Sequence, residues 1–182
     1  MEKKVFSVKT AVAIVIGAAL MFGLKVFPSG VEGTYIQPGI AILAAFAAVF
    51  GPVAGFLIGL IGHFFIDLTN YLTQVEDQLW WSWILSSGLF GLIVGYFWKM
   101  FKKEQYGFDI MQAIIFNGIQ IAANALVWVF AARTLDLLIY KEPFGKVSIQ
   151  GFTAAGINSA VVLVLGTLLV AGYSLIEPKI DS

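Results

Sequence analysis

The sequence contains no cysteine and only one histidine, and charged residues make up 12% of its 182 positions. The lack of cysteine excludes disulfides, thiol nucleophiles and thiolate metal sites, and one histidine cannot build a histidine-rich metal site. Soluble domains usually carry roughly 25% charged residues, so this chain has too few to cover a water-facing surface. Lys and Arg balance Asp and Glu at 11 each, without the basic excess that a nucleic-acid binder needs.

Apolar residues take the place of the missing charges. They make up 59% of the chain, and the mean hydropathy is +0.89. This composition excludes an ordinary cytosolic enzyme and a disordered chain. We therefore expect an all-α membrane protein in which residues 1–182 form a single integral membrane domain.

Six apolar segments are candidates to cross the roughly 30 Å hydrocarbon core, which takes about 20 helical residues. They are predicted at residues 10–27, 38–50, 52–71, 80–101, 108–134 and 151–174. The second is short, and Gly51-Pro52 predicts a tight break before the third. The first could also be read as a signal peptide, but its long apolar stretch and the lack of a small-x-small cleavage site favour a span.

Basic residues set the predicted orientation. With six spans both termini share one side, and a cytoplasmic placement puts Lys3, Lys4, Lys9, Lys99, Lys102, Lys103 and Lys179 inside and Lys25, Arg133, Lys141 and Lys146 outside. The cluster of three lysines at 99–103 strengthens this bias. The outer loops would then be residues 29–37, 72–79 and 135–150, of which the last is long and mixed in character.

Polar side chains gather in the outer halves of four segments, where an ionisable or polar group is costly and needs a reason. His63 and Asp67 lie one turn apart, and residues 117, 120 and 124 form one helical stripe. We predict an outward-facing pocket lined by amides, aromatics and a His-Asp pair, the usual form of a small-molecule site. The predicted lining is His63, Asp67, Asn70, Trp80, Trp83, Ser87, Asn117, Gln120, Asn124 and Asn158.

Structural roles also account for several of these residues taken singly. Trp80 and Trp81 suit an interfacial aromatic belt. The amide stripe suits hydrogen bonding between helices, and Asp67 suits simple pairing with His63. Their convergence at one depth favours the pocket.

Motifs for catalysis are missing. Gly145-Lys146 lacks the upstream glycine of a P-loop, and neither H-E-x-x-H nor G-x-S-x-G occurs. We therefore predict no enzyme activity and no ATP hydrolysis through a P-loop.

Small residues recur at helical spacing in three segments. Those at 51, 55 and 59 and at 88, 91 and 95 predict close packing inside the bundle. In the first segment Ala13 pairs with Gly17 and Ala19 pairs with Gly23. Because this segment has no strongly polar side chain in its core, it can pack either inside the bundle or against another membrane protein.

Over nearly its whole length the chain resembles the substrate-binding S components of energy-coupling factor (ECF) vitamin transporters. The A-x-x-x-A pattern that contacts the family's transmembrane coupling subunit corresponds to Ala13–Gly17, with glycine replacing the second alanine. Residues 37–41, 50–56, 62–63 and 80–88 look like the subgroup labelled riboflavin-type, which also includes cobalamin-type members.

The resemblance implies a multi-pass protein of a prokaryotic plasma membrane that captures a vitamin from outside. Outer loops would form a lid, with Tyr35, Gln37 and residues 72–79 over the pocket. The protein would topple when docked on the coupling subunit, while two ATPase subunits supply energy; no covalent cofactor and no metal are implied. A wide pocket edged by Trp gives cobalamin a slight preference over riboflavin. A self-contained channel or secondary transporter and a membrane assembly protein are the alternatives.

Overall fold

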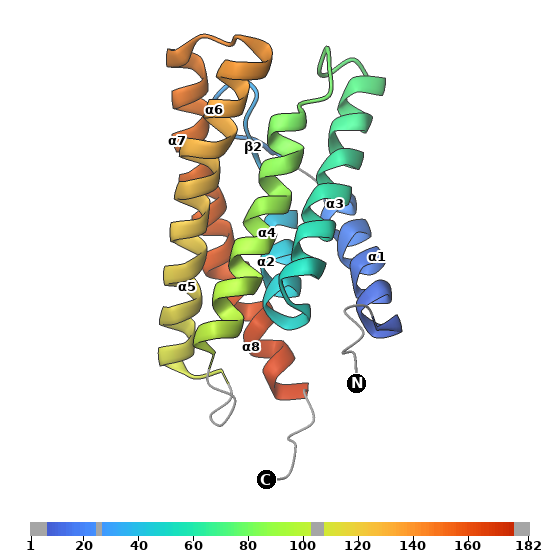
Figure 1. Cartoon of the computed structure of the whole chain (residues 1–182), viewed down its shortest axis with the longest axis vertical. Coiled ribbons are helices and arrows are strands. Elements are labelled where there is room, and N and C mark those ends of the chain that lie inside the picture. Colours follow the sequence, from blue (N-terminus) through green and yellow to red (C-terminus); the bar gives the residue numbers. More distant parts are fainter. Residues whose placement is uncertain (1–6, 25–26, 103–107, 177–182) are drawn as a thin grey trace.

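The structure is a computed structural model and describes residues 7–24, 27–102 and 108–176. Almost all of these residues are helical, and the helices lie side by side in an elongated bundle (Figure 1). The exception is a short antiparallel hairpin, β1 (Phe27–Pro28) with β2 (Tyr35–Ile36). All six predicted segments contain helix, so the all-α expectation holds apart from this hairpin.

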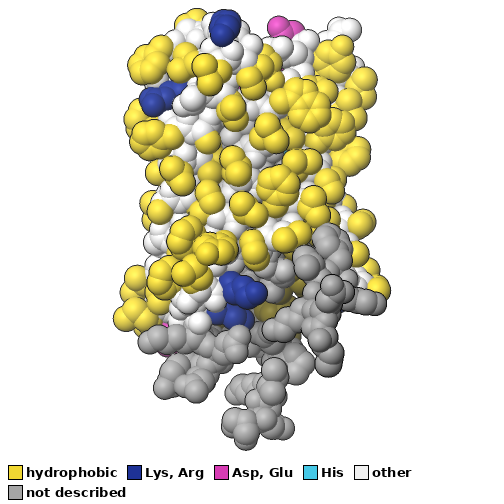
Figure 2. Space-filling model, viewed as in Figure 1, with side chains coloured by type: hydrophobic (Ala, Val, Ile, Leu, Met, Phe, Trp, Pro, Cys, Tyr) yellow, Lys and Arg dark blue, Asp and Glu magenta, His cyan; other side chains and the backbone are white. Residues whose placement is uncertain are grey.

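Four helices are long and apolar enough to span a membrane: α3 (Pro52–Leu72), α4 (Trp81–Phe101), and two composite helices over Ile110–Tyr140 and Phe144–Ile176. The first composite consists of α5 (Ile110–Asn124), the π-helical η2 (Ala125–Ala132), α6 (Arg133–Leu135) and the π-helical η3 (Asp136–Tyr140). The second consists of α7 (Phe144–Val161), the π-helical η4 (Val162–Gly166) and α8 (Thr167–Ile176). Hydrophobic side chains cover the flank of the bundle between its ends (Figure 2). The chain is therefore built to lie in lipid.

Two shorter apolar helices, α1 (Val8–Gly23) and α2 (Gly39–Phe50), complete the bundle. The 12 residues of α2 rise about 18 Å, less than the roughly 30 Å of a hydrocarbon core. Its side chains are buried on several sides, with Ile40, Leu43 and Ala44 fully enclosed. The second segment is thus short, as predicted, and it forms the centre of the bundle.

Glycines let α3 and α4 approach backbone to backbone. A Cβ added to Gly55 would lie 2.5 Å from the carbonyl oxygen of Gly91, and one added to Gly59 would meet the carbonyl of Ser87. Only a residue without a side chain fits at such contacts. The predicted use of these glycines for packing inside the bundle is confirmed.

The prediction of a long loop at residues 135–150 is wrong. The composite helix that starts with α5 continues to Tyr140, and α7 begins at Phe144. Only three residues therefore connect the two helices. Lys141 ends the fifth helix in a left-handed conformation, with φ of 59°. Asp136 is 2% exposed because it lies between helices, although its charge suggested a solvent-facing loop.

Ala13 and Gly17, the pair predicted to contact a partner, face the inside of the bundle in this structure. Ala13 is buried, and a Cβ on Gly17 would lie 2.7 Å from Ile58 of α3. This pair therefore packs inside the bundle, the other alternative that the sequence left open. The second pair, Ala19 and Gly23, lies on the exposed face of α1.

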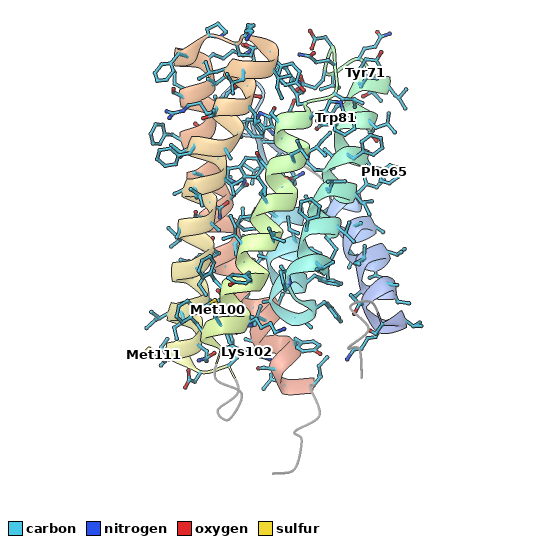
Figure 3. All side chains as sticks on the ribbon, viewed as in Figure 1. Phe65, Tyr71, Trp81, Met100, Lys102 and Met111 are labelled. Carbon is cyan, nitrogen blue, oxygen red and sulfur yellow. The ribbon has the colours of Figure 1, made fainter. Side chains whose placement is uncertain are left out.

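α1 begins and α8 ends at the same end of the bundle, and the turn between α3 and α4 lies at the other (Figure 1). Tyr71 and Trp81 mark this second end, while Met100, Lys102 and Met111 mark the first (Figure 3). Several cations used to predict orientation lie outside the described residues: Lys3, Lys4, Lys25, Lys103 and Lys179. The cytoplasmic placement of the termini stays a prediction.

We expect Gly55→Ala to destabilise the protein by roughly 1–3 kcal/mol, because its new methyl group would force α3 and α4 apart. The midpoint of thermal unfolding in detergent measures this. Gly118→Ala is the matched control, since nothing lies within 4 Å of its Cβ position and alanine favours helix. Equal midpoints for the two variants would contradict the close contact.

Candidate functional site

A cavity of about 220 Å³ lies between α3, the start of α4, η2, α7 and the hairpin. It is at the end of the bundle marked by Tyr71 and Trp81 (Figure 3). Eight of the twelve residues predicted to bind substrate line it: Tyr35, Gln37, His63, Asp67, Asn70, Trp80, Trp83 and Asn158. These eight side chains therefore converge on one cavity in the structure, and their binding role stays a prediction.

One face of α3 supplies the first wall. His63 and Asp67 are 8% and 6% exposed, and Asn70 follows on the same face. The His63 Nδ1 atom lies 2.5 Å from the hydroxyl of Ser87, and its Nε2 atom lies 3.4 Å from Asp67 Oδ1. Gly59, one turn before His63, packs directly against the backbone of Ser87. This close packing of α3 on α4 places the His63 imidazole between the Ser87 hydroxyl and the Asp67 carboxylate.

Three tryptophans form an aromatic wall. The rings of Trp83 and Trp128 lie 5.2 Å apart at 35°. The Trp80 backbone N–H donates to Asp67 at 3.0 Å, and its indole N–H donates to Glu76 at 3.1 Å. These contacts hold large flat surfaces at the edge of the cavity, where a planar ligand can stack.

A stripe at four-residue spacing on α7 forms the opposite wall: Lys146, Gln150, Ala154 and Asn158. The first two were missed because residues 135–150 were taken for a loop. Asn158 is 5% exposed and faces the cavity, and no hydrogen bond of its side-chain amide is found within the described part of the chain. A buried amide normally has a partner, so Asn158 is available to a ligand.

The hairpin covers the cavity. Gln150 donates to the carbonyl oxygen of Glu32 at 2.8 Å, and Tyr35 donates to Glu76 at 3.4 Å. Gly33 adopts φ of 70°, and a Cβ there would lie 2.6 Å from the Gln150 amide nitrogen. The left-handed backbone favours glycine at this position, and the Gln150 amide packs directly against it.

Negative charge dominates the lining. Three carboxylates, on Glu32, Asp67 and Glu76, face one ammonium group on Lys146. Lys146 is already paired with Glu142 at 3.0 Å. Burial, followed by the charge of Glu76, raises the pKa of the Tyr35 phenol. No group of three or more His, Asp or Glu side chains in the described ranges is placed to hold a metal ion.

The remaining four predicted residues do not line the cavity. Ser87 lies behind His63, and the amide stripe is closed on itself. Asn117 donates to Thr167, Gln120 to Asn117, and Asn124 to Gln120, and the indole of Trp128 donates to Asn124. This ladder ties α5 to α8 and positions Trp128, so the interhelical alternative describes the stripe.

Asp136 is a further buried residue that sequence reasoning missed. It accepts hydrogen bonds from the hydroxyl of Ser82 and from the indole of Trp83, the latter at 3.0 Å. Tyr140, one turn later, accepts from the backbone N–H of Trp81 at 2.8 Å. The extension of the fifth helix therefore fixes the start of α4 and the orientation of Trp83.

Comparison with known proteins gives a consistent set of relatives. The family described as "ECF-type riboflavin transporter, S component" matches residues 5–175. A "UPF0397 protein" of Lacticaseibacillus casei is 41% identical over 176 residues, covering 95% of this chain and 92% of that protein. A protein of the same name from Streptococcus gordonii is 44% identical over 179 residues, covering 97% and 94%. No solved structure matches the chain.

We expect Asn124→Ala to lower the free energy of unfolding by about 1–3 kcal/mol, because it leaves the buried Trp128 indole without its acceptor. Asn158→Ala is the matched control. It removes a buried amide from the cavity wall without breaking a described hydrogen bond, so its thermal midpoint should stay near that of the unchanged protein. A larger loss in the control would show that we have assigned the two amides the wrong way round.

Proposed function

The chain belongs to the ECF-type riboflavin transporter S component family, and from this premise we propose that its cavity captures a small organic nutrient from outside the cell for ATP-driven uptake. As an S component, the protein is a substrate-binding transport subunit rather than an enzyme, and it works with the partner subunits of an ECF transporter. A transmembrane coupling subunit and two ATPase subunits are the partners we propose.

The cavity is the observation that carries this proposal. It combines flat aromatic walls with a few convergent polar groups, as small-molecule sites do. Its cover rests on two described side-chain hydrogen bonds, from Gln150 to Glu32 and from Tyr35 to Glu76.

The volume of the cavity restricts the size of the ligand. Pockets for drug-sized ligands have roughly 300–1,000 Å³, so about 220 Å³ suits a compact molecule. A corrin ring with its side chains far exceeds this space, and the isoalloxazine ring of riboflavin comes closer. The cavity volume and the match to a riboflavin transporter family therefore support riboflavin over cobalamin, which the sequence alone slightly preferred.

We expect purified protein to bind one nutrient molecule per chain, detected as a change in tryptophan fluorescence during titration with a vitamin panel that includes riboflavin and cobalamin. His63→Ala, Asp67→Asn and Trp83→Ala should each weaken binding by about tenfold or more, because each removes a polar or stacking group from the cavity wall. Trp81→Ala is the matched control, since Trp81 is 47% exposed and does not line the cavity.

Thermal midpoints measured alongside separate weak binding from poor folding. Unchanged affinity in all three well-folded cavity variants would place the site elsewhere. A loss of affinity in Trp81→Ala equal to that in Trp83→Ala would do the same.

The exposed face of α1 is our candidate contact for the coupling subunit, with Ala19 and Gly23 replacing the buried pair. Nothing lies within 4 Å of the Gly23 Cβ position, so Gly23→Leu should leave the fold and nutrient binding intact. It should reduce co-purification with the coupling and ATPase subunits and slow ATP-dependent uptake. Gly118→Leu, equally open but on α5, is the control.

Transport in liposomes by this chain alone would contradict the partnership and favour a self-contained transporter. Full co-purification of Gly23→Leu would remove this face of α1 from the contact.

A further inference from the structure

The charge of the cavity goes beyond what nutrient capture by itself requires. A neutral vitamin needs hydrogen bonds and stacking, yet the lining carries three carboxylates against one ammonium group. Lys146 forms an ion pair with Glu142, which does not line the cavity. The positive charge of Lys146 is therefore already neutralised and does not offset the three carboxylates of the lining. The space around the ligand is therefore left with negative charge, counting His63 as neutral.

Asp67 and Glu76 are held by neutral donors. Asp67 accepts from the Trp80 backbone and lies near His63, while Glu76 accepts from the Trp80 indole and the Tyr35 hydroxyl. Over the described ranges, neither carboxylate pairs with lysine or arginine. Asp67 is 6% exposed, and a buried carboxylate without a counter-ion is costly. A positively charged ligand would supply the missing counter-ion.

The aromatic wall suits the same ligand. Tryptophan attracts cations to its ring face more strongly than tyrosine or phenylalanine does. Trp80 already shows this, since the Lys146 ammonium lies 6.0 Å from its ring centre. Trp83 offers a second aromatic surface beside the carboxylates, and the buried Trp128 ring supports it from 5.2 Å away.

The unpartnered amide of Asn158 adds an independent sign of a ligand. Asn158 is only 5% exposed, and it lines the same cavity as the carboxylates. An amide both donates and accepts, so it fits the edge of a nitrogen heterocycle. The compact volume favours a ligand smaller than most drug-sized molecules.

Resting on the proposed function, we propose that the substrate of this cavity is a compact organic cation, a positively charged nitrogen heterocycle stacked on Trp83 with its charge toward Asp67 and Glu76. The negative lining also draws such a cation toward the opening and disfavours anionic nutrients.

The test compares charged and neutral probes of matched shape. Purified protein in detergent is titrated with two pairs of probes: 1-methylnicotinamide against its neutral isostere 3-methylbenzamide, and 1-methylnicotinamide against neutral nicotinamide. In each pair the cation should bind at least about tenfold more tightly. Glu76→Gln, which keeps an acceptor for Trp80, should remove most of that preference. Asp77→Asn, the same loss of charge at an exposed neighbour outside the lining, should not.

Riboflavin and cobalamin titrated in parallel separate this inference from the proposed function. If either binds in the cavity while the cations do not, the nutrient-capture proposal stands and the cation proposal is overturned. A cation preference that persists in Glu76→Gln and Asp67→Asn also overturns it. If none of the probes or vitamins binds, both proposals fail.

Discussion

The close approach of α3 and α4 is the constraint on which the cavity depends. Gly55 and Gly59 allow the two backbones to touch, and that contact fixes the relative height of every side chain above it. His63 then meets Ser87, and Asp67 meets the backbone of Trp80. A wider spacing would break both pairings and leave buried polar groups unsatisfied, so helix packing, more than loop structure, forms the polar wall.

Buried amides have two different roles in this molecule. Gln120 and Asn124 are fully enclosed, and each has a side-chain partner on its own helix. Gln120 also donates to the carbonyl oxygen of Ser159 on α7, and Asn124 orients Trp128. Asn158 is almost as deeply buried but faces empty space. Burial and residue type are nearly the same in these positions. Gln120 and Asn124 differ from Asn158 in having another amide one turn away on the same helix as a hydrogen-bond partner.

Helical spacing explains how much of the site could be predicted from the sequence. His63, Asp67 and Asn70 share a face at any position of α3 in the bundle, so their convergence followed from periodicity. Periodicity does not reveal how near a neighbouring helix lies, and the amide ladder was therefore grouped with the cavity.

Gln150, Lys146 and Asp136 were missed for another reason. Charges and a proline near residue 143 resemble a loop, whereas the chain buries Asp136 between helices and continues the helix through η3. The same limit affected Ala13 and Gly17, whose spacing predicts a close contact but not which helix makes it. The helical fold class and the four long apolar helices followed from hydropathy alone.

Helices of very different length share one rigid body. The 16 residues of α1 rise about 24 Å, and the 31 residues of Ile110–Tyr140 rise about 46 Å, against a hydrocarbon slab of roughly 30 Å. α1 and α5 lie on opposite sides of the bundle (Figure 1). A flat bilayer of uniform thickness cannot match both flanks, so the bilayer has to thin beside α1 or the protein has to tilt. The tilt angle of the protein therefore depends on bilayer thickness as well as on the protein itself.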